Sequence, residues 1–160
     1  MTDTGEQQPG PEILTDADVS AFLGENLFGA LAAVKRSGHP HLSTVLYKWD
    51  PAERIVRVSS TRDRLKVRQL RNDPHAALYV TSRDHTRYAV VEGTAEVAET
   101  TEPGDAAGLE LLAMTPGFED GAEREAYLKQ QVEEGRVVIR LRAERLYGMG
   151  LDLPPEMQEL

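Results

Sequence analysis

Six short apolar or alternating segments, each bounded by turn residues, constrain the fold of this chain most. They cover residues 28–34, 41–49, 54–60, 76–81, 87–97 and 137–150. The second segment alternates in side-chain type as a half-buried strand does, and Gly93 inside the fifth predicts a bulge or bend. Short strands joined by tight turns are typical of antiparallel sheets that curl into barrels. The sequence therefore predicts a mainly β protein with six antiparallel strands in a small β-barrel.

Helices are expected at only three connections, which makes them peripheral to the sheet. Thr15, with Asp18 three residues later, predicts a capped helix before the first strand. A basic helix is expected between the third and fourth strands, and a pair of helices between residues 100 and 135. The residues expected to form the apolar faces are Val19, Phe22 and Leu23 in the first helix, Leu109, Leu112 and Ala113 in one inserted helix, and Tyr127, Leu128 and Val132 in the other.

The chain has 160 residues, which is enough for one domain with a core and too few for two ordinary domains. Residues 1–12 are polar and are expected to be a disordered N-terminal tail, with a single domain over residues 13–160. No leader, membrane span or cysteine occurs, so a cytoplasmic protein without disulfides is expected. A net charge of −9 argues against a nucleic-acid partner, and the four histidines have no metal-site spacing, so no metal is expected.

Residues 59–74 contain five of the eighteen Lys and Arg residues of this acidic chain. The segment begins with the hydroxyl residues Ser59, Ser60 and Thr61 at a strand end, and continues as a short helix. The free N–H groups of a helix N-terminus, together with hydroxyl and cationic side chains, are suited to bind phosphate. A solvated basic helix is the alternative that the segment by itself leaves open.

The order of these segments resembles the pyridoxamine-5′-phosphate-oxidase-like superfamily, whose fold is the FMN-binding split β-barrel. The resemblance covers residues 14–150. The motifs that carry it most specifically are Leu31-Ala32 with residues 39–45, Val58-Ser59-Ser60-Thr61 with residues 64–74, and residues 91–97. The segments at residues 62–66 and 145–150 are most similar to the branch of the superfamily that uses the deazaflavin coenzyme F420.

This resemblance implies a homodimer with two cofactor sites at the subunit interface. It implies that Arg64 and Lys66 bind the cofactor phosphate, helped by the three hydroxyl residues, with Gln69 nearby. The cofactor ring would lie along the second strand, and Tyr88 would approach the phosphate from the partner subunit. The cofactor-binding residues expected in this way are Ser43, Val45, Leu46, Tyr47, Ser59, Ser60, Thr61, Arg64, Lys66, Gln69 and Tyr88.

The resemblance implies an oxidoreductase that transfers a hydride from coenzyme F420 to a small conjugated or unsaturated substrate. Two alternatives stay open: an FMN-binding oxidase or flavin reductase, and a non-enzymatic cofactor-binding or haem-binding protein. Vitamin B6 oxidation is disfavoured, because the only tryptophan is Trp49 and the C-terminus lacks the Trp and Arg residues of true pyridoxamine-phosphate oxidases. No catalytic residue is assigned; Tyr47, Lys48, His85 and Tyr88 are candidate proton donors, and residues 82–86 and 100–121 are candidates for the mouth of the site.

Overall fold

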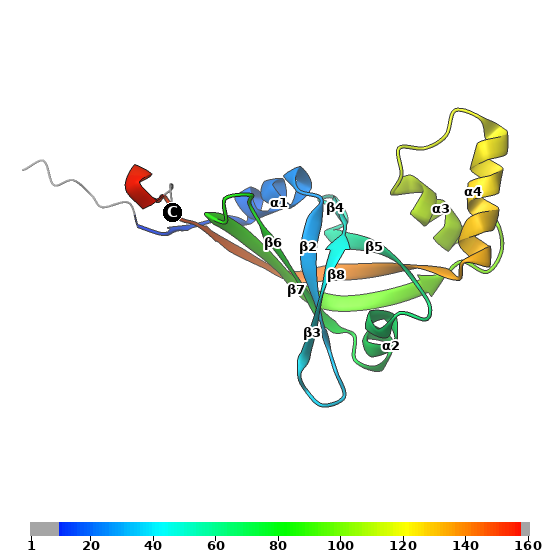
Figure 1. Ribbon diagram of the computed structural model, residues 1–160, viewed down its shortest axis with the longest axis horizontal. Coiled ribbons are helices and arrows are strands. Elements are labelled where there is room, and N and C mark those ends of the chain that lie inside the picture. The colour runs from blue at the N-terminus through cyan, green and yellow to red at the C-terminus, as the bar shows by residue number, and fades with distance from the viewer. Residues whose placement is uncertain (1–9, 158–160) are drawn as a thin grey trace, which may run out of the picture.

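The computed structural model describes residues 10–157 and shows one curled antiparallel sheet with helices around it (Figure 1). The strands follow the order β3-β2-β6-β7-β8-β5-β4, and β1 pairs separately with β8. The elements are β1 (Glu12–Ile13), α1 (Asp16–Glu25), β2 (Phe28–Val34), β3 (Pro40–Leu46), β4 (Lys48–Asp50), β5 (Ile55–Thr61), α2 (Leu65–Asn72), β6 (His75–Thr81), β7 (Arg87–Glu99), α3 (Ala106–Ala113), α4 (Gly121–Glu133), β8 (Arg136–Gly150) and a 3-10 turn (Pro155–Met157).

The mainly β class with peripheral helices is confirmed, but the strand number is eight among the described residues and not six. One added strand is β1, whose Glu12 pairs with Gly150, so the expected tail of residues 1–12 ends earlier than predicted; residues 1–9 lie outside the described residues. The other arises because the segment 41–49 is two strands, which are separated at Tyr47.

Tyr47 marks the place where the chain changes its pairing partner. Its N–H donates to the Leu27 carbonyl at 2.9 Å, and its buried hydroxyl donates to the Leu23 carbonyl at 2.7 Å. Before this residue β3 pairs with β2, and after it β4 pairs with β5. These two strands are the opposite edges of the sheet, so the sheet has to curl for one continuous segment to reach both edges.

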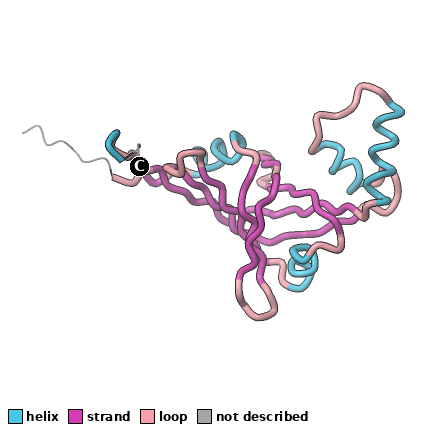
Figure 2. The backbone as a smooth tube through the Cα atoms, in the orientation of Figure 1, coloured by secondary structure: helices cyan, strands magenta, loops and turns pink. Residues whose placement is uncertain are grey.

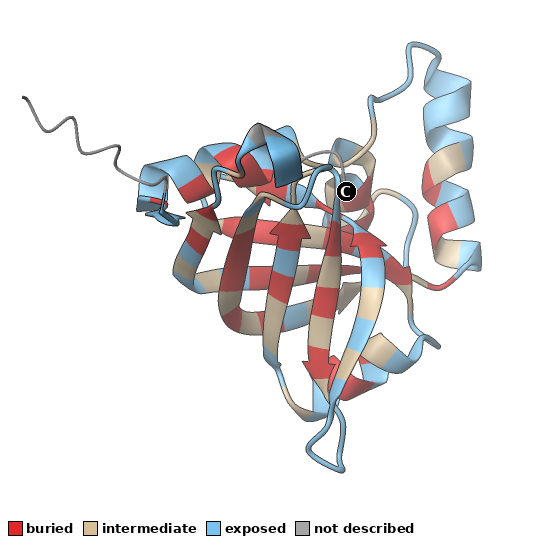
Figure 3. Cartoon of the chain, turned by 60° about the vertical axis from the view of Figure 1, so that its left-hand side comes forward, coloured by how far each residue is buried: buried red, intermediate tan, exposed pale blue. Residues whose placement is uncertain are grey.

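Buried residues alternate with half-buried and exposed ones along the strands (Figure 3). This is the pattern of strands that pack one face on a core. Helix α1 packs against this core through Val19, Phe22 and Leu23, as predicted, and the Thr15–Asp18 capping box is present. The bulge expected at Gly93 is confirmed by a register shift between Glu92 and Gly93. A Cβ atom at Gly93 would lie 1.8 Å from the Arg142 carbonyl oxygen, which leaves room for glycine alone.

Helices α3 and α4 stand together at the end of the sheet where β7 leads into β8 (Figure 2). The faces predicted for them are partly wrong. In α3 the buried side chains include Ala107 and Leu111, whereas Leu109 is exposed; in α4 they are Leu128 and Gln131. The reason is that such short helices are oriented by the strand they cover, here by contact with Val138, more than by their own weak periodicity.

An ion-pair cluster fixes α3 to the sheet. The Glu110 carboxylate accepts hydrogen bonds from Arg57 of β5 at 2.6 Å and from Arg140 of β8 at 2.7 Å. Burial would raise the pKa of Glu110, but the hydrogen bonds from Arg140 and Arg57 outweigh it and hold the pKa below its ordinary value. Among the arginines of β8, Arg136 pairs with Glu134 at the end of α4, whereas Arg140 and Arg142 pair with Glu96, and Arg140 also with Glu110.

We expect Glu110→Gln to lower the free energy of unfolding by about 2 kcal/mol at neutral pH, because two half-buried guanidinium groups lose their shared carboxylate. Since the folded-state pKa of Glu110 is lowered, its contribution is present above the unfolded-state pKa and is lost as the pH falls through the folded-state value. Urea unfolding of wild type and variant should therefore differ at pH 7 and converge in acid. The exposed Glu53→Gln is the control, and an equal loss at both pH values would contradict this account.

Candidate functional site

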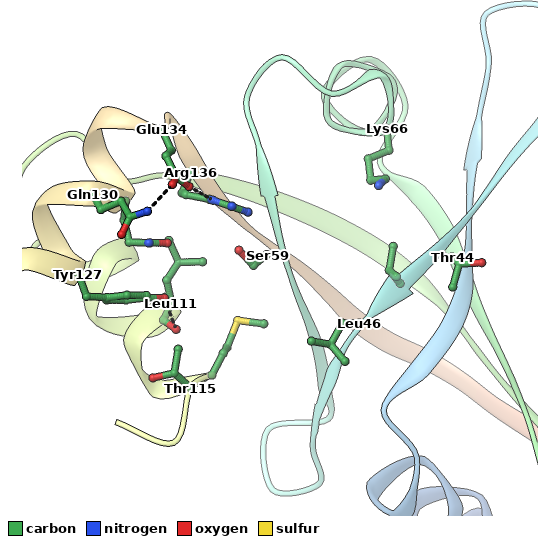
Figure 4. A pocket seen from close by; sticks show the side chains of 13 residues that line it. Thr44, Leu46, Ser59, Lys66, Leu111, Thr115, Tyr127, Gln130, Glu134 and Arg136 are labelled. Carbon is green, nitrogen blue, oxygen red and sulfur yellow. Dashed lines mark hydrogen bonds and ion pairs between the residues drawn. The ribbon is translucent and has the colours of Figure 1, made fainter. Parts of the chain in front are cut away.

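A cavity of about 550 Å³ lies between the edge of the sheet and the α3–α4 pair. One side is formed by Thr44, Val45 and Leu46 of β3, Ser59 of β5 and Lys66 of α2. In Figure 4, Lys66, Thr44 and Leu46 lie across the gap from the helical side chains, with Ser59 between them. The opposite side is formed by Leu111, Met114, Thr115, Tyr127, Gln130, Gln131, Glu134 and Arg136.

The structure brings four of the predicted cofactor residues to this cavity, namely Val45, Leu46, Ser59 and Lys66. The hydroxyl triplet does not act as one unit, because successive strand residues point to opposite faces. Ser59 is exposed to the cavity and Thr61 is half-buried, whereas the side chain of Ser60 is buried in the sheet. Of the three predicted hydroxyls, only that of Ser59 lines the cavity.

Arg64 is exposed and is the N-cap residue of α2, where its side chain makes no capping hydrogen bond. The first N–H groups of α2 are therefore not capped by a side chain. Arg64 does not line the cavity, but its positive charge lies close enough to Lys66 to influence the pKa of that lysine.

The other predicted residues point elsewhere. The Tyr47 side chain is buried in the core, where its hydroxyl donates to the Leu23 carbonyl, and it does not line the cavity. Gln69 is buried with its amide oxygen 2.7 Å from Nδ1 of His41. Tyr88 stacks on Tyr79, with ring centroids 5.6 Å apart, and does not line the cavity.

Ser43 has the one buried side-chain polar atom that lacks a hydrogen-bond partner among the described residues. Buried hydroxyls are normally paired, so an unpaired one next to a cavity-lining strand segment indicates a position where a bound molecule supplies the partner. Ser43 directly precedes Thr44, which is the first of the three consecutive β3 residues that line the cavity. Ser43 itself does not line the cavity, so its role in cofactor binding stays a prediction.

Lys66 gives the cavity an uncompensated positive charge. Burial lowers the pKa of Lys66 below its ordinary value, and the like charge of Arg64 lowers it further by a smaller amount. No carboxylate of the described residues lies within ion-pair distance of its ammonium group. A bound anion would relieve both unfavourable effects, which makes this end of the cavity suited to a phosphate.

The sequence analysis did not predict the residues that line the helical side of the cavity, except that it expected residues 100–121 at the mouth. That expectation is met by Leu111, Met114 and Thr115, whereas residues 82–86 do not line the cavity. Gln131 had a recognisable signal, because it follows Leu128 by three residues and therefore lies on the apolar stripe of its helix. Arg136 and Glu134 pair with each other at 2.7 Å at the rim.

The residues present fit a phosphorylated ring cofactor. The cavity volume lies within the range of small-molecule sites, about 300–1,000 Å³. It offers an extended strand edge at β3 and a cation without a partner at Lys66. Within residues 10–157 no group of three or more His, Asp or Glu side chains is placed to hold a metal ion, and no helix has the length and apolarity needed to cross a membrane.

A curled antiparallel sheet with a cavity beside its edge strand is the architecture of a split-barrel protein. Residues 15–150 match the Pyridoxamine 5'-phosphate oxidase family, and because this match spans most of the chain, the chain belongs to that family. The resemblance found from the sequence is thereby confirmed.

Solved structures agree with this assignment. A conserved hypothetical protein of Mycobacterium tuberculosis, Rv2991, is 23% identical with a TM-score of 0.66, over 86% of this chain and 85% of that one. A protein named as an F420 reductase is 27% identical with a TM-score of 0.55, over 79% of this chain and 94% of its own. An FMN-binding protein of Nostoc punctiforme related to pyridoxamine 5'-phosphate oxidase is 12% identical with a TM-score of 0.59, over 82% and 79% of the two chains. The first and third of these likenesses concern the fold alone.

We expect Lys66→Ala to weaken binding of a phosphorylated cofactor, F420 or FMN, about thirtyfold, because a hydrogen bond to a charged group is lost. Lys66→Arg should retain most of the affinity.

The affinity of the wild type for the cofactor should fall at alkaline pH, as Lys66 loses its proton. Since the pKa of Lys66 is lowered, this fall should begin at a lower pH than it would for an ordinary lysine. Isothermal titration measures both effects. Lys129→Ala on the exposed face of α4 makes the same change of charge outside the cavity, and an equal loss in that variant would refute a specific role for Lys66.

Proposed function

We propose that this protein is an oxidoreductase that uses coenzyme F420 to transfer a hydride to a small conjugated or unsaturated substrate. The observation that carries the proposal is the uncompensated Lys66 at one end of a cavity that runs along the edge strand β3. The likeness to a protein named as an F420 reductase supports the choice of cofactor. FMN is the alternative, because it also carries a phosphate that Lys66 would bind and is a cofactor of the same fold.

In this proposal each part of the cavity has a distinct task. The β3 segment Thr44–Leu46 is the bed for the ring, and Lys66 with the uncapped start of α2 holds the phosphate. When bound, the deazaflavin supplies the hydride as a two-electron carrier. The chain orients the reactants and excludes water, with Leu111 and Met114 covering the side opposite β3.

A substrate that accepts a hydride at a conjugated double bond becomes an anion, which a proton then neutralises. Tyr127 lines the cavity, and burial raises the pKa of its hydroxyl, so its proton passes only to a strong base such as the anion that hydride addition leaves. Lys48 is engaged with the Ala113 carbonyl at 3.1 Å outside this cavity. Tyr127 is therefore the nearer candidate for the proton donor among the chain's own groups.

A second, basic cavity favours F420 over FMN. This cavity, of about 420 Å³, lies between the β2–β3 turn and α2, and is lined by Lys35, Arg36 and Arg68 among others. None of these three cations makes an ion pair with a described carboxylate. Lys66 and Arg68 lie on different sides of α2, so we propose that a long acidic tail passes around the start of this helix to reach these cations, whereas FMN ends at its phosphate.

We expect the wild-type protein to bind F420 at micromolar concentration or tighter and FMN more weakly. Arg68→Ala should reduce F420 affinity about fivefold, through loss of one charge-assisted contact, and leave FMN affinity unchanged. Arg71→Ala, on the same helix but facing Glu99, is the control. Micromolar FMN binding without F420 binding would overturn the cofactor choice, and hydride transfer to a panel of enones and quinones tests the activity.

The site is proposed to lie at the interface of a homodimer. Strand register places Phe28, Leu46, Tyr79 and Tyr147 on the outer face of the sheet, where each is more than a third exposed. Leu46 also lines the cavity, so the cavity borders this apolar face. A second copy covering the face would enclose the cavity and bring its own Tyr88, which lies on the same face, toward it.

We expect sedimentation equilibrium to show a dimer, and Leu42→Glu to convert it to a folded monomer with weaker cofactor binding. Leu42 is 64% exposed on the outer face, so a charge there opposes association without disturbing the core. Leu109→Glu on the exposed side of α3 is the matched control. A wild-type monomer, or an unchanged dimer in the Leu42 variant, would exclude this interface.

A further inference from the structure

Gln131 is an exception among the polar side chains of the cavity. It is only 6% exposed, yet its side-chain amide makes no hydrogen bond within the described residues. It lines the cavity, so its amide has access to a bound molecule. Since Ser43 has the one fully buried polar atom without a partner among the described residues, the Gln131 amide is not sealed off but opens on the cavity, where a ligand can pair with it.

The neighbouring polar groups on the same side are already engaged. The Thr115 hydroxyl donates to the Leu112 carbonyl at 2.7 Å, and the Tyr127 hydroxyl donates to the Leu111 carbonyl at 3.4 Å. The Gln130 amide donates to Glu134 at 2.7 Å, and the same carboxylate neutralises Arg136. Apart from Tyr127, the candidate proton donor, whose hydrogen bond is long, Gln131 is therefore the uncharged polar side chain that the described residues of the helical side leave free for a ligand.

The surroundings of Gln131 are neutral. Leu111 and Met114 are apolar, and the nearest charges on this side, Glu134 and Arg136, cancel in a pair. The opposite side of the cavity carries the uncompensated Lys66. The two sides thus differ in charge: one is suited to an anion, and the other to an uncharged molecule.

We propose that Gln131 is a substrate-recognition residue, which pairs with a planar amide, such as a lactam or carboxamide, of an uncharged conjugated substrate. A primary amide offers two N–H donors and a carbonyl acceptor in one plane, and only a group with both a donor and an acceptor satisfies it on both sides. A carboxylate would leave the Gln131 carbonyl facing negative charge. The inference rests on the proposed function, since it assigns the ligand of Gln131 as the substrate and not the cofactor.

The test compares two probes of nearly the same shape, the benzo-fused lactam carbostyril and its lactone counterpart coumarin, which lacks the N–H donor. Binding to the full-length protein is measured by ligand-observed NMR, with and without added F420. Wild type should bind the lactam about tenfold more tightly, because the lactone leaves the Gln131 carbonyl unpaired. Gln131→Leu should remove this preference, whereas Gln130→Leu on the same helix should retain it. A wild type without preference, or a Gln131→Leu variant that keeps it, overturns the inference.

Two further readouts separate this inference from the proposed function. Thermal unfolding of Gln131→Leu shows whether the variant is folded. Gln131→Glu, which keeps the side-chain size and the acceptor, should retain the preference, because a carboxylate still accepts the lactam N–H, but should bind both probes more weakly, because it no longer donates to their carbonyl. F420 affinity should be unchanged in both variants. A loss of F420 affinity equal to that of Lys66→Ala would mean that Gln131 contacts the cofactor, which overturns the inference and leaves the proposed function intact. Failure of wild type to bind F420, with the lactam preference preserved, would instead overturn the proposed function.

Discussion

The curl of the sheet depends on one residue, Tyr47, at which a single run of chain leaves one edge of the sheet and joins the other. Its hydroxyl is hydrogen-bonded to Leu23 in α1, and its backbone N–H to Leu27 in the turn that follows. These bonds fix the position at which β3 ends and β4 begins. Because β3 and β4 are the two edge strands, a flat sheet would hold them a full sheet width apart. The cavity exists because this closure leaves a gap beside β3, into which α2 and the α3–α4 pair face.

The two sides of the cavity are held together by different physical means. The sheet side is part of the main apolar core, which continues from α1 through the inner face of the strands. The helical side has only a small apolar cluster around Leu111 and Val138, and Glu110 adds charge-assisted hydrogen bonds to two strands. The helical side is thus attached by a few polar contacts to a rigid support, an arrangement in which substrate contacts can vary without changes to the fold.

Much of the fold was predictable because it rests on local signals. The Thr15 capping box, the Gly93 bulge and the alternating strands act within a few residues of sequence. The basic segment predicted Lys66, which lines the cavity, although its binding role stays a prediction. The split of Ser59 and Ser60 between two faces follows from the strand expected over residues 54–60, but the three hydroxyls were predicted as one group. The burial of Gln131 on a short helix depends on tertiary neighbours and was not predictable, although its place on an apolar stripe was a usable signal.

Strand β8 is the last long strand of the chain, and it lies between β7 and β5 near the middle of the sheet. Without residues 136–150 the sheet falls into two parts, β3-β2-β6-β7 and β5-β4, which share no strand pairing. During synthesis on the ribosome, both parts therefore present unpaired strand edges until nearly the whole domain has emerged. Folding of this protein is consequently completed after translation of its C-terminal strand, and the interval before that is when the chain is most exposed to aggregation.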